Sequence, residues 1–123
     1  MPFLELLDIE AVANSSDEVR LKMAWREQLC TTAGVMHGGA IMSLADTAGA
    51  MCAFLNLPEG TGTTTIESKT NFFRAVRGGS VEAVARPLHA GRTIVVVETD
   101  IVDDAGKRVA RVTQTQAVLQ PRS

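Results

Sequence analysis

The stretch HGGAIMSLADTAGAMCAFL, residues 37–55, predicts one long helix that starts at about Gly39. The helix is expected to end at Asn56-Leu57-Pro58, because the residue before a proline is pushed out of helical geometry. Its length would allow a membrane span, but its small residues and a central acid, Asp46, favour a buried helix of a soluble protein. Because one helix is not a core by itself, the rest of the chain must wrap round it.

The apolar residues change to a period of two after this helix. Four strands are expected, at about 62–75, 80–88, 92–103 and 107–119. Their separators, VRGGS, HAGR and DDAGK, are short Gly-containing turns that suit antiparallel hairpins, so the sheet is expected to be mainly a meander. Before the helix, VRLKMAW alternates like a half-buried strand, and FLELLDIEAVAN begins as a helical turn or a strand.

The strand RTIVVVETDIV is apolar on both sides. One face carries Val95, Val97 and Ile101, and the other carries Ile94, Val96 and Val102. The helix can cover only one of these faces. We therefore expect a second subunit to cover the other, which makes an oligomer the favoured state.

The composition indicates one cytoplasmic domain over residues 1–123 that binds a small molecule. Twelve basic and fourteen acidic residues give a net charge of −2 without a basic stripe, which argues against nucleic acid. Two cysteines without a CxxC pair and two histidines indicate neither a disulfide framework nor a metal site, so no metal or other cofactor is expected. The first eight residues have no basic start or cleavage site of a signal peptide.

The start of the helix has the makeup of an anion-binding pocket. His37-Gly38-Gly39 places no Ser, Asp or Asn directly before the first turn, so the first N–H groups are expected to lack partners at the positive end of the helix dipole. Glycines let a ligand oxygen approach such donors closely. The alternative is that the two glycines only form a tight entry into the helix.

Asp46 requires a partner or a task, because a carboxylate on a buried helix costs several kcal/mol and no Lys or Arg lies within four residues of it. A tertiary salt bridge or a backbone N–H is the structural alternative. Asp46 is eight residues beyond Gly38, which places the two about 12 Å apart along one helix. If two such helices pack antiparallel about a twofold axis, the N-terminus of one can face Asp46 of the other, which predicts a site shared by two chains.

Three segments together resemble the hotdog-fold acyl-CoA thioesterases of the phenylacetate-degradation type, over nearly the whole chain. They are GVMHGGAIMSLADTAGA, TTTIESKTNFFRAV and ARPLHAGRTIVVVETDIVDDAGKRVA. The resemblance implies an α+β hotdog fold, in which a five- or six-stranded antiparallel sheet wraps round one long helix. It also implies dimers with two sites at the interface, and tetramers formed as dimers of dimers.

The resemblance also assigns roles to particular residues. The carboxylate falls on Asp46, the carbonyl-polarising N–H on Gly38 and the signature histidine on His37, while a hydroxyl that orients water falls on Thr65. For His37 and Thr65, ordinary structural roles are the alternative. Thr31 stands where the family often has Asn or Gln, six residues before the histidine, and Thr has a shorter reach and no amide.

The expected substrate is an acyl-CoA, which the chain would hydrolyse to the free acid and coenzyme A. Arg92 is the first choice to bind the CoA phosphates, with Arg74 or Arg77 as a second, although scattered surface arginines are common. Gly39 is expected at the site beside Gly38. An acyl pocket of aromatic and methionine side chains is expected, or these residues form core; they are Phe54, Phe72, Phe73, Met42 and Met51.

Two other functions stay open on this fold. A non-catalytic acyl-CoA-binding module is favoured by Thr31 in place of the amide residue. A dehydratase or hydratase would need a histidine and an acid in a different arrangement, and the helix carries no second histidine. His89, in a turn, is expected at the surface or near a ligand.

Overall fold

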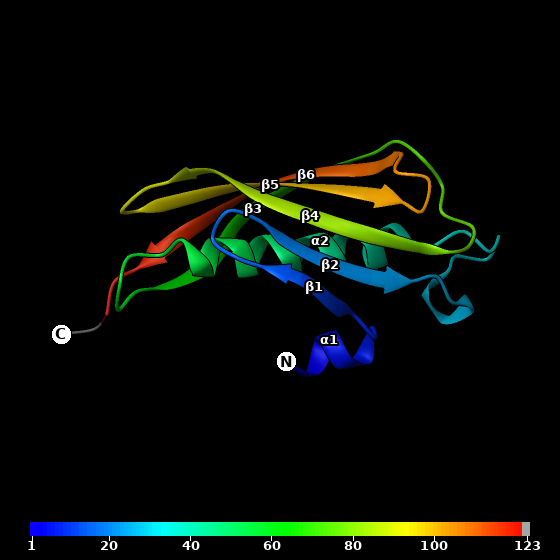
Figure 1. Cartoon of the computed structure of the whole chain (residues 1–123), viewed down its shortest axis with the longest axis horizontal. Coiled ribbons are helices and arrows are strands. Elements are labelled where there is room, and N and C mark those ends of the chain that lie inside the picture. Colours follow the sequence, from blue (N-terminus) through cyan, green and yellow to red (C-terminus); the bar gives the residue numbers. More distant parts are fainter. Residues whose placement is uncertain (122–123) are drawn as a thin grey trace.

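The computed structural model describes residues 1–121 as a six-stranded antiparallel sheet wrapped round one long helix (Figure 1). In chain order the elements are α1 (Pro2–Leu6), β1 (Glu10–Asn14), β2 (Val19–Ala24), the 3-10 turn η1 (Glu27–Leu29), α2 (Gly38–Leu55), β3 (Gly62–Phe72), β4 (Ser80–Ala90), β5 (Ile94–Asp103) and β6 (Arg108–Leu119). The arrangement is the α+β hotdog fold, which confirms the predicted fold class.

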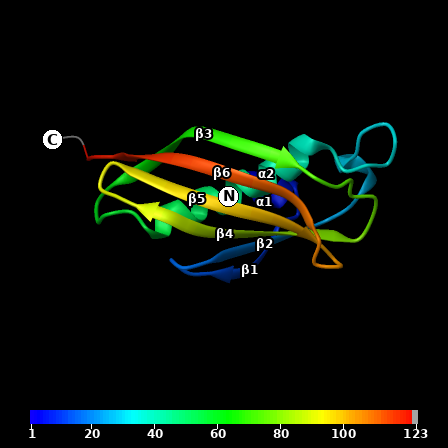
Figure 2. The same ribbon diagram turned by 90° about the horizontal axis from the view of Figure 1, so that it is seen from above.

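The order of the strands corrects one part of the predicted meander. Across the sheet the strands run β1-β2-β4-β5-β6-β3 (Figure 2), so β4, β5 and β6 are joined by the expected hairpins. However, β3 pairs with β6 and not with β4, so the hairpin predicted at VRGGS is wrong. The reason lies in the connecting segment, where Val76 is buried and its carbonyl accepts a hydrogen bond from Met36 N–H at 2.8 Å. This contact ties the segment to the loop before α2.

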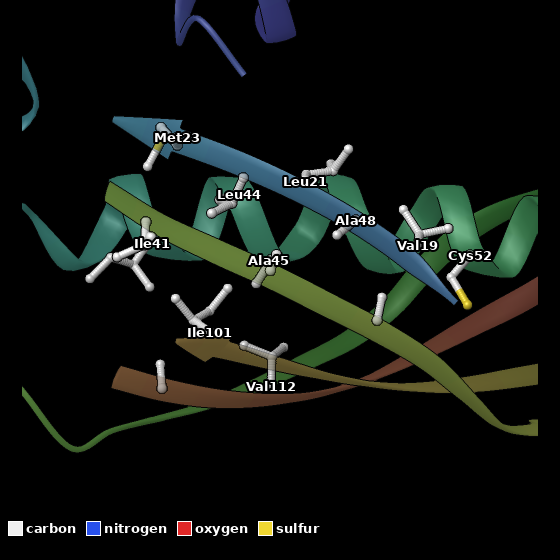
Figure 3. Close-up of a cluster of buried hydrophobic side chains, with 14 of the residues drawn as sticks. Val19, Leu21, Met23, Ile41, Leu44, Ala45, Ala48, Cys52, Ile101 and Val112 are labelled. Atoms are coloured by element: carbon white, nitrogen blue, oxygen red, sulfur yellow. The ribbon is translucent and has the colours of Figure 1, made fainter. Parts of the chain in front are cut away.

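The core lies between α2 and the concave face of the sheet (Figure 3). Helix residues three and four positions apart, including Ile41, Leu44, Ala45, Ala48 and Cys52, face the sheet and are at most 2% exposed. They pack with side chains from β2, β5 and β6, among them Val19, Leu21, Met23, Ile101 and Val112. The alanines bring the helix close to the sheet. Each larger side chain buried here contributes about 1.5–3 kcal/mol.

The convex face of the sheet is not the apolar surface that the sequence predicts for strand 92–103. Val96 and Val102 are only half-buried, and charged side chains stand among them. Arg111 Nε binds Asp100 at 2.9 Å, and its guanidinium lies 3.5 Å from Glu98. This face is therefore mixed, and it gives no reason by itself for a second subunit.

The uncovered surfaces lie instead on α2 and at one edge of the sheet. α2 is long and apolar enough to cross a membrane by length and composition, yet its sheet-facing side is buried in the core. Its other side carries Met42 and Phe54, which are 39% and 64% exposed. At the sheet edge, β3 is exposed along residues 64–69, and its Ile66 is 62% exposed.

Candidate active site

The N-terminus of α2 is capped by the histidine that precedes it. His37 Nδ1 accepts a hydrogen bond from Gly39 N–H at 2.7 Å, so the expectation of an uncapped helix is wrong for this donor. An imidazole nitrogen takes the place that a Ser or Asp oxygen usually has at this position. Within the described residues 1–121, the Gly38 N–H has no acceptor, so it is the donor that remains available to a ligand.

Gly38 lies beneath an aromatic ring of β3. A Cβ atom at Gly38 would lie 3.2 Å from Phe72 Cζ, which is tighter than ordinary van der Waals contact. The glycine thus lets Phe72 pack against the start of the helix. Of the two neighbouring phenylalanines predicted for an acyl pocket, Phe72 is the one that lies against Gly38.

Asp46 lies on the exposed side of α2, although a carboxylate on this helix was expected to be costly to bury. Its position therefore carries no burial cost within one chain. The carboxylate stands beside an apolar cavity of about 520 Å³ between α2 and the N-terminal α1. The cavity is lined by Met1, Phe3, Ala50, Met51 and Phe54 as well as by Asp46.

A chain of buried amides and hydroxyls connects Asp46 to the sheet. Gln114 Nε2 donates to Asp46 Oδ1 at 2.9 Å and to Thr65 Oγ1 at 3.3 Å. Gln116 Nε2 donates to the same Thr65 oxygen at 2.8 Å, and the side-chain oxygen Oε1 of Gln116 accepts from Thr63 Oγ1 at 3.1 Å. Thr65 and Asp46 thus share one amide donor, which brings two of the predicted site residues together.

The strand that carries Thr65 is irregular at this point. The register between β3 and β6 shifts between Thr65 and Glu67, which marks a β-bulge. Bulges re-aim side chains and are frequent beside active sites. Ahead of the bulge, Thr63 and Thr65 both reach the buried glutamines of β6.

Gln114 and Gln116 were not among the residues predicted from the sequence, although a signal for them was present. The residues of β6 that face the core alternate regularly: Ala110, Val112, Gln114, Gln116 and Val118. Gln114 and Gln116 are 0% and 1% exposed, so two amides occupy core positions of an otherwise apolar face. Buried polar side chains in such a pattern require partners, and they indicate a functional or structural network.

Thr31 and Arg92 are not brought to the centre of this site within one chain. Thr31 is exposed in the loop after η1, where its backbone N–H donates to Val35 O at 2.8 Å. Arg92 is exposed in the turn between β4 and β5, at the end of the molecule away from the N-terminus of α2 in both views (Figures 1 and 2).

A basic groove lies at the end of the molecule that carries the N-terminus of α2. It has a volume of about 360 Å³ and is lined by Phe73, Arg74, Lys107 and Arg108. Arg108 binds Asp100 at 3.1 Å, whereas Arg74 and Lys107 form no ion pair with any described residue. The predicted Phe73 and the second-choice Arg74 therefore share a site that fits an anion with an aromatic or apolar part.

The two cysteines are free, and among the described residues no group of three His, Cys, Asp or Glu side chains could hold a metal ion. Cys52 lies in the core, where burial raises the pKa of its thiol to about 11. A thiol with so high a pKa is a poor nucleophile near neutral pH.

The fold is that of a hotdog thioesterase. The model of the thioesterase superfamily matches residues 33–110, and the chain belongs to that family. The chain is 32% identical over 116 residues to the proofreading thioesterase EntH of Cronobacter turicensis, which covers 94% of this chain and 85% of that protein. Thioester hydrolysis is thus supported by relatives as well as by the fold.

Solved structures agree with this assignment. A thioesterase from Haemophilus influenzae superposes with a TM-score of 0.91 at 31% identity, over 96% of this chain and 82% of that chain. The Escherichia coli PaaI protein from the phenylacetic acid degradation operon has a TM-score of 0.87 at 24% identity, over 95% of this chain and 83% of that one. At that identity the second likeness shows the fold alone.

Proposed function

We propose that the protein is an acyl-CoA thioesterase that hydrolyses an aromatic or medium-chain acyl-CoA to the free acid and coenzyme A. The observation that carries the proposal is the position of Asp46 at the edge of an apolar cavity. Its carboxylate oxygen Oδ1 accepts a hydrogen bond from the buried Gln114 Nε2 at 2.9 Å. A thioester is an activated acyl donor, so hydrolysis needs mainly a polarised carbonyl and a directed nucleophile.

In the proposed reaction, Asp46 acts as general base on a water molecule. The water oxygen attacks the thioester carbon while its proton passes to the carboxylate, and the carbonyl oxygen becomes an oxyanion. The tetrahedral intermediate then expels the thiolate of coenzyme A, which takes up the proton. The alternative route is direct attack by Asp46 to form an anhydride, which water hydrolyses. Thr65 would hold the attacking water, and its shared amide with Asp46 supports that role.

The oxyanion would be stabilised by Gly38 N–H at the positive end of the α2 dipole. In this proposal His37 fixes the first turn by capping Gly39 N–H, and Gly39 contributes by allowing the substrate to come close. Loss of one such oxyanion donor typically costs about 10²- to 10³-fold in rate.

Gly38 and Asp46 of one chain lie too far apart to flank one carbonyl, since eight helical residues span about 12 Å. We propose that the two groups come from different subunits of a twofold dimer. The long edge strand β3 supports this, because its exposed residues 64–69 leave backbone groups free to pair with a second copy. As the resemblance to the family implies, two such dimers would form a tetramer. The free cysteines of the chain suit a reducing cytoplasm.

The two ends of the substrate have matching surfaces on the chain. The cavity beside Asp46 would take the acyl group, because it is apolar and large enough for a ring or a chain of moderate length. The basic groove would take the phosphates of coenzyme A on Arg74 and Lys107, with Phe73 offering a face to the adenine. We prefer this groove to Arg92 because it lies at the same end of the molecule as Gly38.

The direct test is the release of free thiol from a panel of aromatic and aliphatic acyl-CoAs by the wild type and Asp46→Asn. We expect the wild type to hydrolyse at least one thioester, and the variant to lose at least about 100-fold in rate while its melting temperature is kept. Equal activity in both proteins would show that Asp46 is not the base.

A second candidate function is an acyl-CoA-binding module without hydrolysis. Thr31, which has no amide to hold the carbonyl, is the observation that favours it. A wild-type protein that binds an acyl-CoA and leaves it intact for hours would support this function and overturn the first.

A further inference from the structure

The side chain of Gln114 is the only described group that hydrogen-bonds the Asp46 carboxylate. It comes from β6, across the core from α2, and is 0% exposed. A buried amide is costly unless its donors and acceptors are used, so its presence on an apolar face requires a reason.

The orientation of this amide is fixed by its neighbours. Asp46 Oδ1 only accepts hydrogen bonds when ionised, so the nitrogen of Gln114 must point toward it, at 2.9 Å. A flipped amide would place its oxygen against the Asp46 carboxylate, and the hydrogen bond between the two would be lost. The donor is therefore directed at Asp46 by chemistry as well as by packing.

The other end of the amide is left without a partner. Gln114 Oε1 is buried and has no hydrogen-bond donor among residues 1–121. It lies against Gly49 on α2, where a Cβ atom would come within 1.9 Å of it. A buried oxygen without a hydrogen bond costs about 1–3 kcal/mol, so the position of Gln114 is not explained by the hydrogen bonding of its own oxygen. Gly49 leaves the space for this oxygen, and the favourable interactions of the amide are the hydrogen bonds that its nitrogen donates.

We propose that Gln114 is a positioning residue for hydrolysis, which holds the Asp46 carboxylate in the orientation that faces Thr65. The inference rests on the proposed function, because it assumes that Asp46 is the base. Asp46 is exposed, so without this bond its side chain would be free to turn into solvent. A displacement of about 1 Å in a reacting group can cost about 100-fold in rate.

The matched control is on the same strand. Gln116 is also a buried glutamine and its side-chain amide also donates to Thr65, but it forms no hydrogen bond with Asp46. Gln114→Met and Gln116→Met each remove one buried amide and keep the length of the side chain. Their difference therefore isolates the bond to Asp46 from the general cost of changing the core.

The experiment measures kcat, KM and melting temperature for both variants and for Asp46→Asn, with the best acyl-CoA of the panel. We expect Gln114→Met to lower kcat about 10- to 100-fold, to leave KM within about twofold, and to lower kcat at least five times more than Gln116→Met does. If Gln114→Met does not fold, Gly49→Ala displaces the same amide without removing it and should give the same selective loss of kcat.

The outcomes separate this inference from the proposed function. An inactive Asp46→Asn beside a Gln114→Met whose kcat equals that of Gln116→Met would overturn the positioning role alone. A rise in KM without a fall in kcat would overturn it too. A fully active Asp46→Asn would overturn the role of Asp46 as the base, and the inference with it.

Discussion

His37 Nδ1 accepts a hydrogen bond from Gly39 N–H at 2.7 Å, so the histidine of the HGG segment is the N-cap of the central helix. Removing such a cap typically costs about 1 kcal/mol, and Ser restores it because its oxygen accepts the same N–H. We therefore expect His37→Ala to lower the melting temperature and His37→Ser to keep it close to the wild-type value.

The same pair of variants decides between capping and catalysis. As a cap, His37 acts on the rate only through the geometry of Gly38, so His37→Ser should keep activity within about threefold while His37→Ala loses more. Calorimetry and thiol release are measured on the same preparations. A His37→Ser protein that is stable and inactive would mean that the imidazole contacts the thioester.

The central helix could be predicted from the sequence because its signals are local. The glycines at its start and Asn56-Leu57-Pro58 after it define its ends, and the structure places it at Gly38–Leu55. The partner of β3 could not be predicted in the same way. A turn such as VRGGS suits a hairpin locally. In the structure, however, the carbonyl of the buried Val76 accepts a hydrogen bond from Met36 N–H, and this contact joins residues forty positions apart.

The residues of the candidate site likewise divide into those that a local signal predicts and those that only the fold brings together. Asp46 and Gly38 follow from a short motif, and Thr65 follows from a resemblance, so sequence alone could name them. Gln114 lies 68 positions from Asp46, and only the folded sheet brings the two together. Its signal was a polar residue in a buried period of two, which predicts a network without naming its partner.

The apolar cavity should set the preference for the acyl group. Ala50 lines it on α2, and Ala50→Phe would fill part of its space of about 520 Å³. We expect kcat/KM to fall at least about tenfold for phenylacetyl-CoA or octanoyl-CoA and to stay within about threefold for acetyl-CoA, because lost pocket contacts cost about 1–3 kcal/mol.

Phe54→Ala is the converse variant, since Phe54 lines the same cavity and is 64% exposed. It should shift the preference toward longer chains. Equal losses for short and long acyl groups in both variants would contradict the assignment of this cavity to the acyl group.

The Cys52 thiol should be inert in the folded protein. Burial raises its pKa to about 11, so at pH 8 only about one thiol in 10³ is ionised, and the reactive thiolate becomes more abundant only as the pH approaches the pKa. In Cys30→Ser, which leaves one thiol, we expect no rapid reaction with a disulfide reagent at pH 8 and full reaction in guanidinium. Rapid labelling of the native variant would show that the helix separates from the sheet.

The basic groove makes the last prediction, because it should distinguish coenzyme A from shorter thiols. Arg74→Ala and Lys107→Ala each remove a cation that has no ion pair among the described residues. We expect each to raise KM for an acyl-CoA about five- to tenfold, since a phosphate contact at the surface contributes about 1 kcal/mol. The same acyl group on pantetheine, which carries no nucleotide, should show no change.

Lys22→Ala is the control for a general loss of positive charge, since Lys22 is exposed on β2 and does not line the groove. Added salt should raise the wild-type KM for the acyl-CoA and leave that for the acyl-pantetheine unchanged, because ions screen the phosphate contacts. If Arg92→Ala raises KM for the acyl-CoA and the groove variants do not, the phosphates bind at the turn between β4 and β5. The nucleotide of coenzyme A would then extend toward the end of the molecule that is away from the N-terminus of α2.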